Sequence, residues 1–168
     1  MSVNRGKDFE AVVRECMQKV PETYVLRLYD PQGGYSSVAN PCDFVVYRRG
    51  ILYMIECKAV HGNLLSINSN DPKKKYGQIS NTQWEGLLEA RKKGVVAGVL
   101  VWWIDHDVTK FIPIEEVALQ KDYCEAKSIR YDLDIPYSNI ITGTKKRVFF
   151  DYDFEAFFNK HEEGEKLF

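Results

Sequence analysis

Residues 41–58, PCDFVVYRRGILYMIECK, hold two apolar runs separated by the dipeptide Arg49-Gly50. Two runs rich in β-branched and aromatic residues around a short glycine-containing pair are typical of a β-hairpin. Both alternating faces of the runs are apolar, which is typical of strands covered on both sides at the centre of an α/β sheet. The stretch therefore predicts an antiparallel hairpin over residues 43–47 and 51–58.

The predicted two-residue turn determines which side chains meet at the open end of the hairpin. If Arg48 pairs with Ile51, Asp43 lies opposite Glu56, with Cβ atoms ~4.5–5.5 Å apart. Two carboxylates at that spacing, beside apolar neighbours, require a cation. Lys58 shares the face of Glu56 because side chains alternate along a strand. Lys58 can be that cation by itself, in a structural Glu–Lys pair, or the two acids can hold a divalent ion.

The same residue types suit the hydrolysis of a phosphodiester. That reaction needs a nucleophilic water and relief of the negative charge that grows on the phosphate. Mg²⁺ or Mn²⁺ provides both and prefers hard oxygen ligands. Asp43, Glu56 and the backbone carbonyl of Cys57 are candidate ligands. Lys58 is the candidate for holding the attacking water and offsetting charge in the transition state.

Two predicted helices supply further candidates. Apolar residues at i, i+3 and i+4 spacing predict a helix over residues 4–20, with Glu10 at the edge of the apolar stripe. That carboxylate can reach the sheet or remain a surface glutamate. A second helix over residues 80–93 places Gln83 within its apolar face. The amide can bond a carboxylate of the site or a phosphate, or it can close a capping box with Ser80.

The rest of the chain completes one α/β pattern. We expect strands over 24–29, 95–104, 108–114 and 148–150, loops over 30–40 and 61–77, and helices over 115–121 and 154–160. The signal between 122 and 146 is weak. The order helix, three strands, helix, strand predicts a single domain over residues 1–168, with a core of about 4–114 and a C-terminal extension over 115–168.

Aromatic residues mark parts of the expected core. Trp102 and Trp103 alternate along their strand, so at least one of them is expected to be buried. The phenylalanines and tyrosine between residues 149 and 158 are expected to form a core cluster or a dimer contact.

The amino-acid composition does not indicate whether the protein binds nucleic acid. The formal net charge is −1, but basic runs at 48–49, 73–75, 91–93 and 145–147 stand apart from the acidic residues at 151–165. Such grouping can produce one basic and one acidic face, although short charge runs are also common on solvated surfaces. The four cysteines lack metal-ligand spacing, and no apolar run approaches the ~20 residues of a membrane span. We therefore expect a cytoplasmic protein with reduced thiols.

The residues collected above resemble a known superfamily. Asp43 followed by Glu56-Cys57-Lys58 resembles the core of PD-(D/E)XK nucleases. The opening Asn4-Arg5-Gly6 with Phe9-Glu10, and Gln83 at a helix start, resemble the RecU-like and archaeal-type Holliday junction resolvases. The resemblance covers about residues 4–114. It implies a restriction-endonuclease-like core, in which a mixed central β-sheet is flanked by helices in the order αβββαβ.

The resemblance also implies an activity. It describes a homodimeric, Mg²⁺-dependent DNA endonuclease that resolves four-way junctions by paired nicks. It assigns metal binding to Glu10, Asp43 and Glu56, a catalytic role to Lys58 and a supporting role to Gln83.

Two departures bear on the substrate. RecU-type proteins carry a protruding segment before the catalytic aspartate, which is short here at residues 31–42, while the lysine loop at 73–75 is extended. Residues after 114 have no counterpart. A nuclease acting on linear duplex or single-stranded DNA, and a DNA-binding module of the same fold without activity, are therefore alternatives.

Several basic and aromatic side chains are candidates for contact with DNA. Lysines can grip phosphates and a tyrosine can stack on an opened base, although each can equally be solvated surface. The candidates are Arg5, Lys7, Lys73, Lys74, Lys75 and Tyr76.

Overall fold

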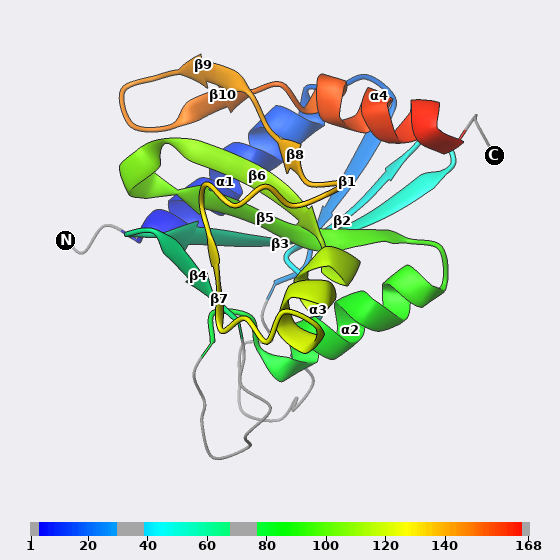
Figure 1. Cartoon of the computed structure of the whole chain (residues 1–168). Helices are drawn as coiled ribbons and strands as arrows, with labels where there is room; N and C mark the ends of the chain where they lie inside the picture. The colour runs from blue at the N-terminus through cyan, green and yellow to red at the C-terminus, as the bar shows by residue number, and fades with distance from the viewer. Residues whose placement is uncertain (1–3, 30–38, 68–76, 166–168) are drawn as a thin grey trace.

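A computed structural model describes residues 4–29, 39–67 and 77–165, and its centre is a six-stranded sheet of order β1-β2-β3-β5-β6-β8 (Figure 1). The elements are α1 (Arg5–Gln18), β1 (Thr23–Arg27), β2 (Phe44–Arg48), β3 (Ile51–Val60), β4 (Leu64–Ser66), α2 (Asn81–Lys92), β5 (Val96–Trp103), η1 (Ile104–His106), β6 (Val108–Pro113), α3 (Ile114–Asp122), β7 (Ser128–Arg130), β8 (Asn139–Ile140), β9 (Gly143–Lys145), β10 (Phe150–Tyr152) and α4 (Phe154–Glu165). β3 and β5 are parallel, and the other neighbours in this sheet are antiparallel. The predicted mixed α/β sheet and the order αβββαβ are confirmed.

The hairpin at the middle of the sheet has the predicted turn. Arg48 pairs with Ile51, and Arg49 and Gly50 both have positive φ, 46° and 89°. Two positive φ angles in a two-residue loop match the right-handed twist of the flanking strands.

The basic pair at this turn does not form a free basic face. The Arg48 side chain is fully buried and ion-pairs with Glu162, and its Nη1 donates to Asn159 Oδ1 over 3.0 Å. Arg49 ion-pairs with Glu22 and Glu162. Glu162 lies on α4 and pairs with both arginines, so the first basic run and part of the acidic tail neutralise each other.

Helices cover the two faces of the sheet and create two hydrophobic cores (Figure 1). On one face, α1 and α4 pack their apolar residues onto β2 and β3. On the other face, α2 and α3 pack onto β5 and β6. Trp102 and Trp103 are both buried, one in each core, so the expectation of at least one core tryptophan is met twice.

The C-terminal third is built into the same sheet and core. β8 adds to the edge at β6, and β9 and β10 pair with each other. The expected aromatic cluster is core, because Tyr152, Phe154, Phe157 and Phe158 pack with the residues of α1. The strands between residues 122 and 146 are two or three residues long, which is too short to produce a periodic pattern. The last helix extends to Glu165 instead of ending at 160.

The expectation that both faces of the hairpin are covered is wrong at the β1–β2 edge. Tyr24, Leu26, Tyr47 and Leu52 are 64%, 42%, 51% and 38% exposed. Helix α2 packs mainly on β5, so this end of the antiparallel edge has one covered face, as such strands commonly do.

Other expectations on the connecting segments are tested in part. The expected loop over 61–77 contains the short strand β4, which pairs with β7. Residues 30–38 and 68–76 lie outside the described residues. All four cysteines are free thiols, as predicted. Within the described ranges, none of the helices combines the length and apolar character that a membrane crossing demands.

Candidate active site

Glu56 lies near the middle of β3, where the neighbouring strand β5 and helix α2 bury its side chain to 4% exposure. Its Oε1 accepts a hydrogen bond from Gln83 Nε2 over 2.7 Å. The same amide closes the capping box of α2: Ser80 N–H donates to Gln83 Oε1 over 2.9 Å, and Gln83 N–H donates to Ser80 Oγ over 3.2 Å. Both interpretations of Gln83 therefore hold at once.

Lys58 completes this group. Its Nζ lies 2.7 Å from Glu56 Oε1 and 3.4 Å from Gln83 Oε1. The two residues share a face of β3 because they are two positions apart. One carboxylate, one ammonium and one amide are thus linked on the face of the sheet that α2 covers.

The environment of Glu56 raises its pKa to about 7. Burial is the main cause, since a carboxylate in an apolar setting loses hydration. The charge of Lys58 lowers the pKa, and the charges of Asp43 and Glu10 raise it again. These three acids are therefore close enough to affect one another.

A second group forms around Arg27, at the end of β1. Arg27 Nη1 donates to Asp43 Oδ1 over 3.0 Å, and Nη2 ion-pairs with Glu10 from α1. The three side chains are 16–18% exposed. The guanidinium also lies over the ring of Phe44, 5.4 Å from its centroid. Because Glu10 lies at the edge of the apolar stripe of α1, its carboxylate reaches Arg27 on β1 of the sheet.

The expected direct pairing of Asp43 with Glu56 is not part of the ladder. The ladder ends at the pair Phe44–Ile55, and Asp43 N–H donates to the Ile55 carbonyl over 3.1 Å, one residue short of Glu56. The carboxylate Oδ2 instead accepts from the N–H of Cys57 over 2.8 Å. The backbone of Asp43 thus bonds to the residue before Glu56, and its side chain bonds to the residue after Glu56. Both bonds close the open end of the hairpin.

The donor atoms suit a hard divalent cation, but they are engaged by protein cations. Glu10, Asp43, Glu56 and the Cys57 carbonyl offer the oxygen ligands that Mg²⁺ and Mn²⁺ take. In the part of the chain that the structure describes, no group of three or more His, Cys, Asp or Glu side chains is arranged to hold a metal ion. With all groups ionised, three carboxylates face Arg27 and Lys58, which leaves one negative charge uncompensated.

Of the candidates for DNA contact, the structure describes only Arg5 and Lys7, at the start of α1. Lys7 is exposed, and its N–H is capped by Asn4 Oδ1 over 3.2 Å. Arg5 lies over the ring of Phe149, with 5.9 Å between guanidinium carbon and centroid. Both precede Glu10 on the same helix. Lys73, Lys74, Lys75 and Tyr76 lie outside the described residues.

Arg27 is the site residue that the sequence reasoning missed. Strand periodicity does not distinguish an arginine that reaches round a strand end from one that points into solvent. Charge counting is the signal that was available. Three buried or half-buried acids with Lys58 as their only cation would leave two unbalanced charges, which indicates a further basic partner.

Comparison with protein-family models finds no match, and comparison with curated proteins finds none either. Among solved structures, the chain is similar to Hjc from Archaeoglobus fulgidus, described as a Holliday junction resolvase from an archaeal hyperthermophile. The two are 19% identical, the match covers 66% of this chain and 74% of that chain, and the TM-score is 0.41. A similarity of this size assigns neither an activity nor a set of catalytic residues to the chain.

Proposed function

We propose that this protein is a divalent-metal-dependent DNA endonuclease of the PD-(D/E)XK type. The observation that carries the proposal is the connected site itself. Glu56 is bonded to Lys58 and Gln83, and Asp43 and Glu10 share Arg27, within interacting distance of Glu56. A hydrolytic centre for a phosphodiester needs acids for a metal and a cation for developing charge, and both are present.

Asp43, Glu56, Glu10 and the carbonyl of Cys57 would hold Mg²⁺ or Mn²⁺. When bound, such an ion activates water and neutralises charge on the phosphate. Asp43 is positioned for this role by the N–H of Cys57, which fixes one carboxylate oxygen. Arg27 offsets the charge of Glu10 and Asp43 and would have to release them in part before both could become metal ligands.

Lys58 is proposed as the group that orients the attacking water and offsets charge in the transition state. The Lys58 side chain is 19% exposed, so solvent reaches part of it while its ammonium is bonded to Glu56. Gln83 is proposed as a positioning residue. Its amide nitrogen holds Glu56 Oε1, and its oxygen is held in turn by the Ser80 N–H at the start of α2. The capping box therefore fixes which way the amide points.

The proposed substrate is a four-way DNA junction, and the proposed assembly is a homodimer. Both rest on the resemblance of residues 4–10 and 43–58 to the RecU-like and archaeal-type resolvases. A homodimer with one site per protomer would explain paired nicks. Arg5 and Lys7 are proposed to contact the DNA backbone beside Glu10, from which they lie about one and a half turns and about one turn away on α1.

A synthetic four-way junction incubated with the protein and Mg²⁺ tests the proposal. The expected result is two symmetric nicks, with linear duplex and single-stranded DNA of the same sequence cut more slowly. Asp43→Asn should bind the junction without cutting it. Asp134→Asn is the matched control, because Asp134 is exposed and lies outside the site.

Other outcomes separate the alternatives. Faster cleavage of linear duplex would support a nuclease activity but would reject a four-way junction as the preferred substrate. Binding without cleavage in Mg²⁺ and in Mn²⁺ would reject the nuclease and leave a DNA-binding module.

A further inference from the structure

The three basic runs that the structure describes differ in how far acidic side chains neutralise them. Both arginines of the run at 48–49 pair with glutamates. The run at 91–93 is also paired throughout, because its arginine lies 2.7 Å from Glu115 and each of its lysines lies within 4.0 Å of Glu89. Of these runs, only the one at 145–147 retains cations without an ion pair.

This third run lies at the tip of the β9–β10 hairpin (Figure 1). Lys145 ends β9 and its Nζ lies 2.7 Å from Asp107 Oδ1. Lys146 and Arg147 follow in the hairpin loop, and both are exposed. Neither of them forms an ion pair of 4.0 Å or less with a residue that the structure describes. The tip of the hairpin therefore carries two uncompensated positive charges.

Asp151 on β10 is engaged by other groups. Its Oδ1 accepts from Lys19 Nζ over 3.4 Å and from Cys16 Sγ over 3.7 Å. The pKa of Asp151 is lowered mainly by the bond to Lys19 and only to a smaller degree by the charge of Lys146. Asp151 therefore does not take the place of a partner for the hairpin tip.

An aromatic side chain fixes the loop against the core. The ring of Phe149 lies 5.4 Å from the ring of Trp102, centroid to centroid. The Lys146 N–H closes the loop by donating to the Phe149 carbonyl over 2.7 Å. A loop that is already anchored loses little conformational freedom when its exposed side chains bind a partner.

The same aromatic ring connects the hairpin to the start of α1. The guanidinium carbon of Arg5 lies 5.9 Å from the centroid of Phe149. Arg5 also forms no ion pair within the described ranges. Arg5, Lys146 and Arg147 therefore lie on one surface, although more than a hundred residues separate them in sequence. A cluster of unpaired cations on one surface is typical of contact with nucleic-acid phosphates.

This surface lies near the candidate active site. In the ladder between β3 and β5, Trp102 pairs with Ala59, which is the residue after Lys58. The Phe149 ring that packs on Trp102 therefore places the hairpin tip level with the end of the site, on the face that α1 covers. A DNA strand carries one phosphate per ~3.4 Å of helix axis, so a few nucleotides bridge the two positions.

We propose that the tip of the β9–β10 hairpin binds the phosphate backbone of DNA, with Lys146 and Arg147 extending the contact surface of Arg5. The inference rests on the proposed function for its partner and adds a second point of attachment to the same site. Phosphate contacts hold and position the duplex without reading its sequence. The hairpin therefore sets the affinity for DNA and its placement, and it does not select the sequence that is cut.

Fluorescence anisotropy in EDTA tests the proposal, with a labelled four-way junction and a labelled linear duplex of the same sequence. Lys146→Gln/Arg147→Gln should weaken the binding of both DNAs by about tenfold or more at low salt. The slope of log K against log salt should become shallower by about two, one for each lost phosphate contact. Both DNAs should be affected alike, because both present the same backbone.

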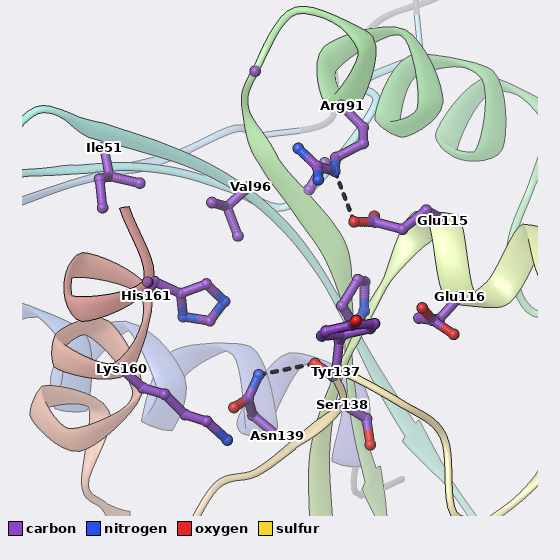
Figure 2. A pocket seen from close by; sticks show the side chains of 14 residues that line it. Ile51, Arg91, Val96, Glu115, Glu116, Tyr137, Ser138, Asn139, Lys160 and His161 are labelled. Carbon is purple, nitrogen blue, oxygen red and sulfur yellow. Dashed lines mark hydrogen bonds and ion pairs between the residues drawn. The ribbon is translucent and has the colours of Figure 1, made fainter. Parts of the chain in front are cut away.

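Lys92→Gln/Lys93→Gln is the matched control, because it removes the same charge from two adjacent exposed lysines. These lysines end α2, before the start of β5. Figure 2 shows that end of the sheet, where Arg91 and Val96 line a cavity of about 720 Å³. Val96 lies six residues before Trp102, so the control is ~20 Å along β5 from the anchor of the hairpin. The control variant should bind both DNAs as the wild type does.

Equal binding by the hairpin variant and the control variant, or an unchanged salt slope, overturns the proposal. Cleavage by the wild type in Mg²⁺ would then still support the nuclease. Hairpin-dependent binding without cleavage in Mg²⁺ has the opposite meaning, since it supports the hairpin contact and rejects the nuclease. Unchanged DNA binding together with lost binding to phosphatidylserine vesicles would indicate a membrane surface and would also overturn the proposal.

An unchanged thermal midpoint shows that each variant is folded. If the double variant does not fold, Arg147→Gln alone decides the matter, because Arg147 is exposed in the loop and its loss should make the salt slope shallower by about one.

Discussion

Arg27 donates from Nη1 to Oδ1 of Asp43 over 3.0 Å, across the edge of the sheet at which β2 begins. The same guanidinium ion-pairs with Glu10. One cation therefore occupies the position between the two acids that the proposed metal would also neutralise. Arg27 and a divalent ion are predicted to substitute for each other as sources of positive charge.

Arg27→Met should lower the free energy of unfolding by about 2 kcal/mol in EDTA, because two largely buried carboxylates lose a charged donor. Saturating Mg²⁺ should restore part of that loss. Urea unfolding with and without Mg²⁺ measures both. Arg130→Met removes an exposed pair with Asp132 and should change stability by less than about 0.5 kcal/mol. An equal loss in EDTA and in Mg²⁺ would show that the ion does not replace Arg27.

The Gln83 amide bonds both Ser80 and Glu56, so substitutions at Ser80 and Gln83 are expected to affect stability alike but cleavage differently. Ser80→Ala and Gln83→Ala both break the capping box, and each should destabilise the protein by about 1 kcal/mol. Only Gln83→Ala also removes the bond to Glu56, so only that variant should lower the cleavage rate, by about tenfold or more if Glu56 must be held in place. Single-turnover cleavage and urea unfolding of the two variants make the comparison. Equal cleavage rates would remove Gln83 from the site.

Lys58→Met should lower the single-turnover cleavage rate about a hundredfold or more, as expected for the loss of a donor to developing charge. Junction binding should persist, because the substrate is held mainly through its backbone phosphates. Lys92→Met serves as the control, since that lysine is exposed on α2. A variant that cuts at the normal rate would leave Lys58 as a structural partner of Glu56 only.

Glu56 predicts a pH dependence of stability in the metal-free protein. Its pKa is raised from 4.5 to about 7. Between these values the unfolded chain releases the proton while the folded chain retains it, so stability falls as pH rises and levels off above about 7. The full effect corresponds to about 3 kcal/mol. Urea unfolding in EDTA at pH 5 and pH 8 should show most of this loss for the wild type, and Glu56→Gln should lack it.

The hairpin was predictable because its information is local. The apolar runs and the Arg49-Gly50 turn fix the pairing of Arg48 with Ile51 without help from the rest of the chain. The capping box of Ser80 and Gln83 is local in the same way. These two features position Glu56, Lys58 and Gln83, which contact one another in the structure.

The missed features depend on residues that are distant in sequence. Arg27 acquires its role only when β1, α1 and the start of β2 meet. Arg48 looks like part of a basic surface run, but α4 buries it more than a hundred residues later in the chain. The shift of Asp43 to Ile55 is a departure at the strand end, and alternation along a strand does not reveal such a departure.

Trp102 and Trp103 are consecutive residues of β5, yet their indoles belong to different cores. β5 therefore separates the two cores, and unfolding of the helices on either face would expose one of the two indoles to solvent. The fluorescence of Trp102 therefore reports on one core, and the fluorescence of Trp103 reports on the other. Because both residues lie on the same strand, the two cores are expected to unfold together in a single transition.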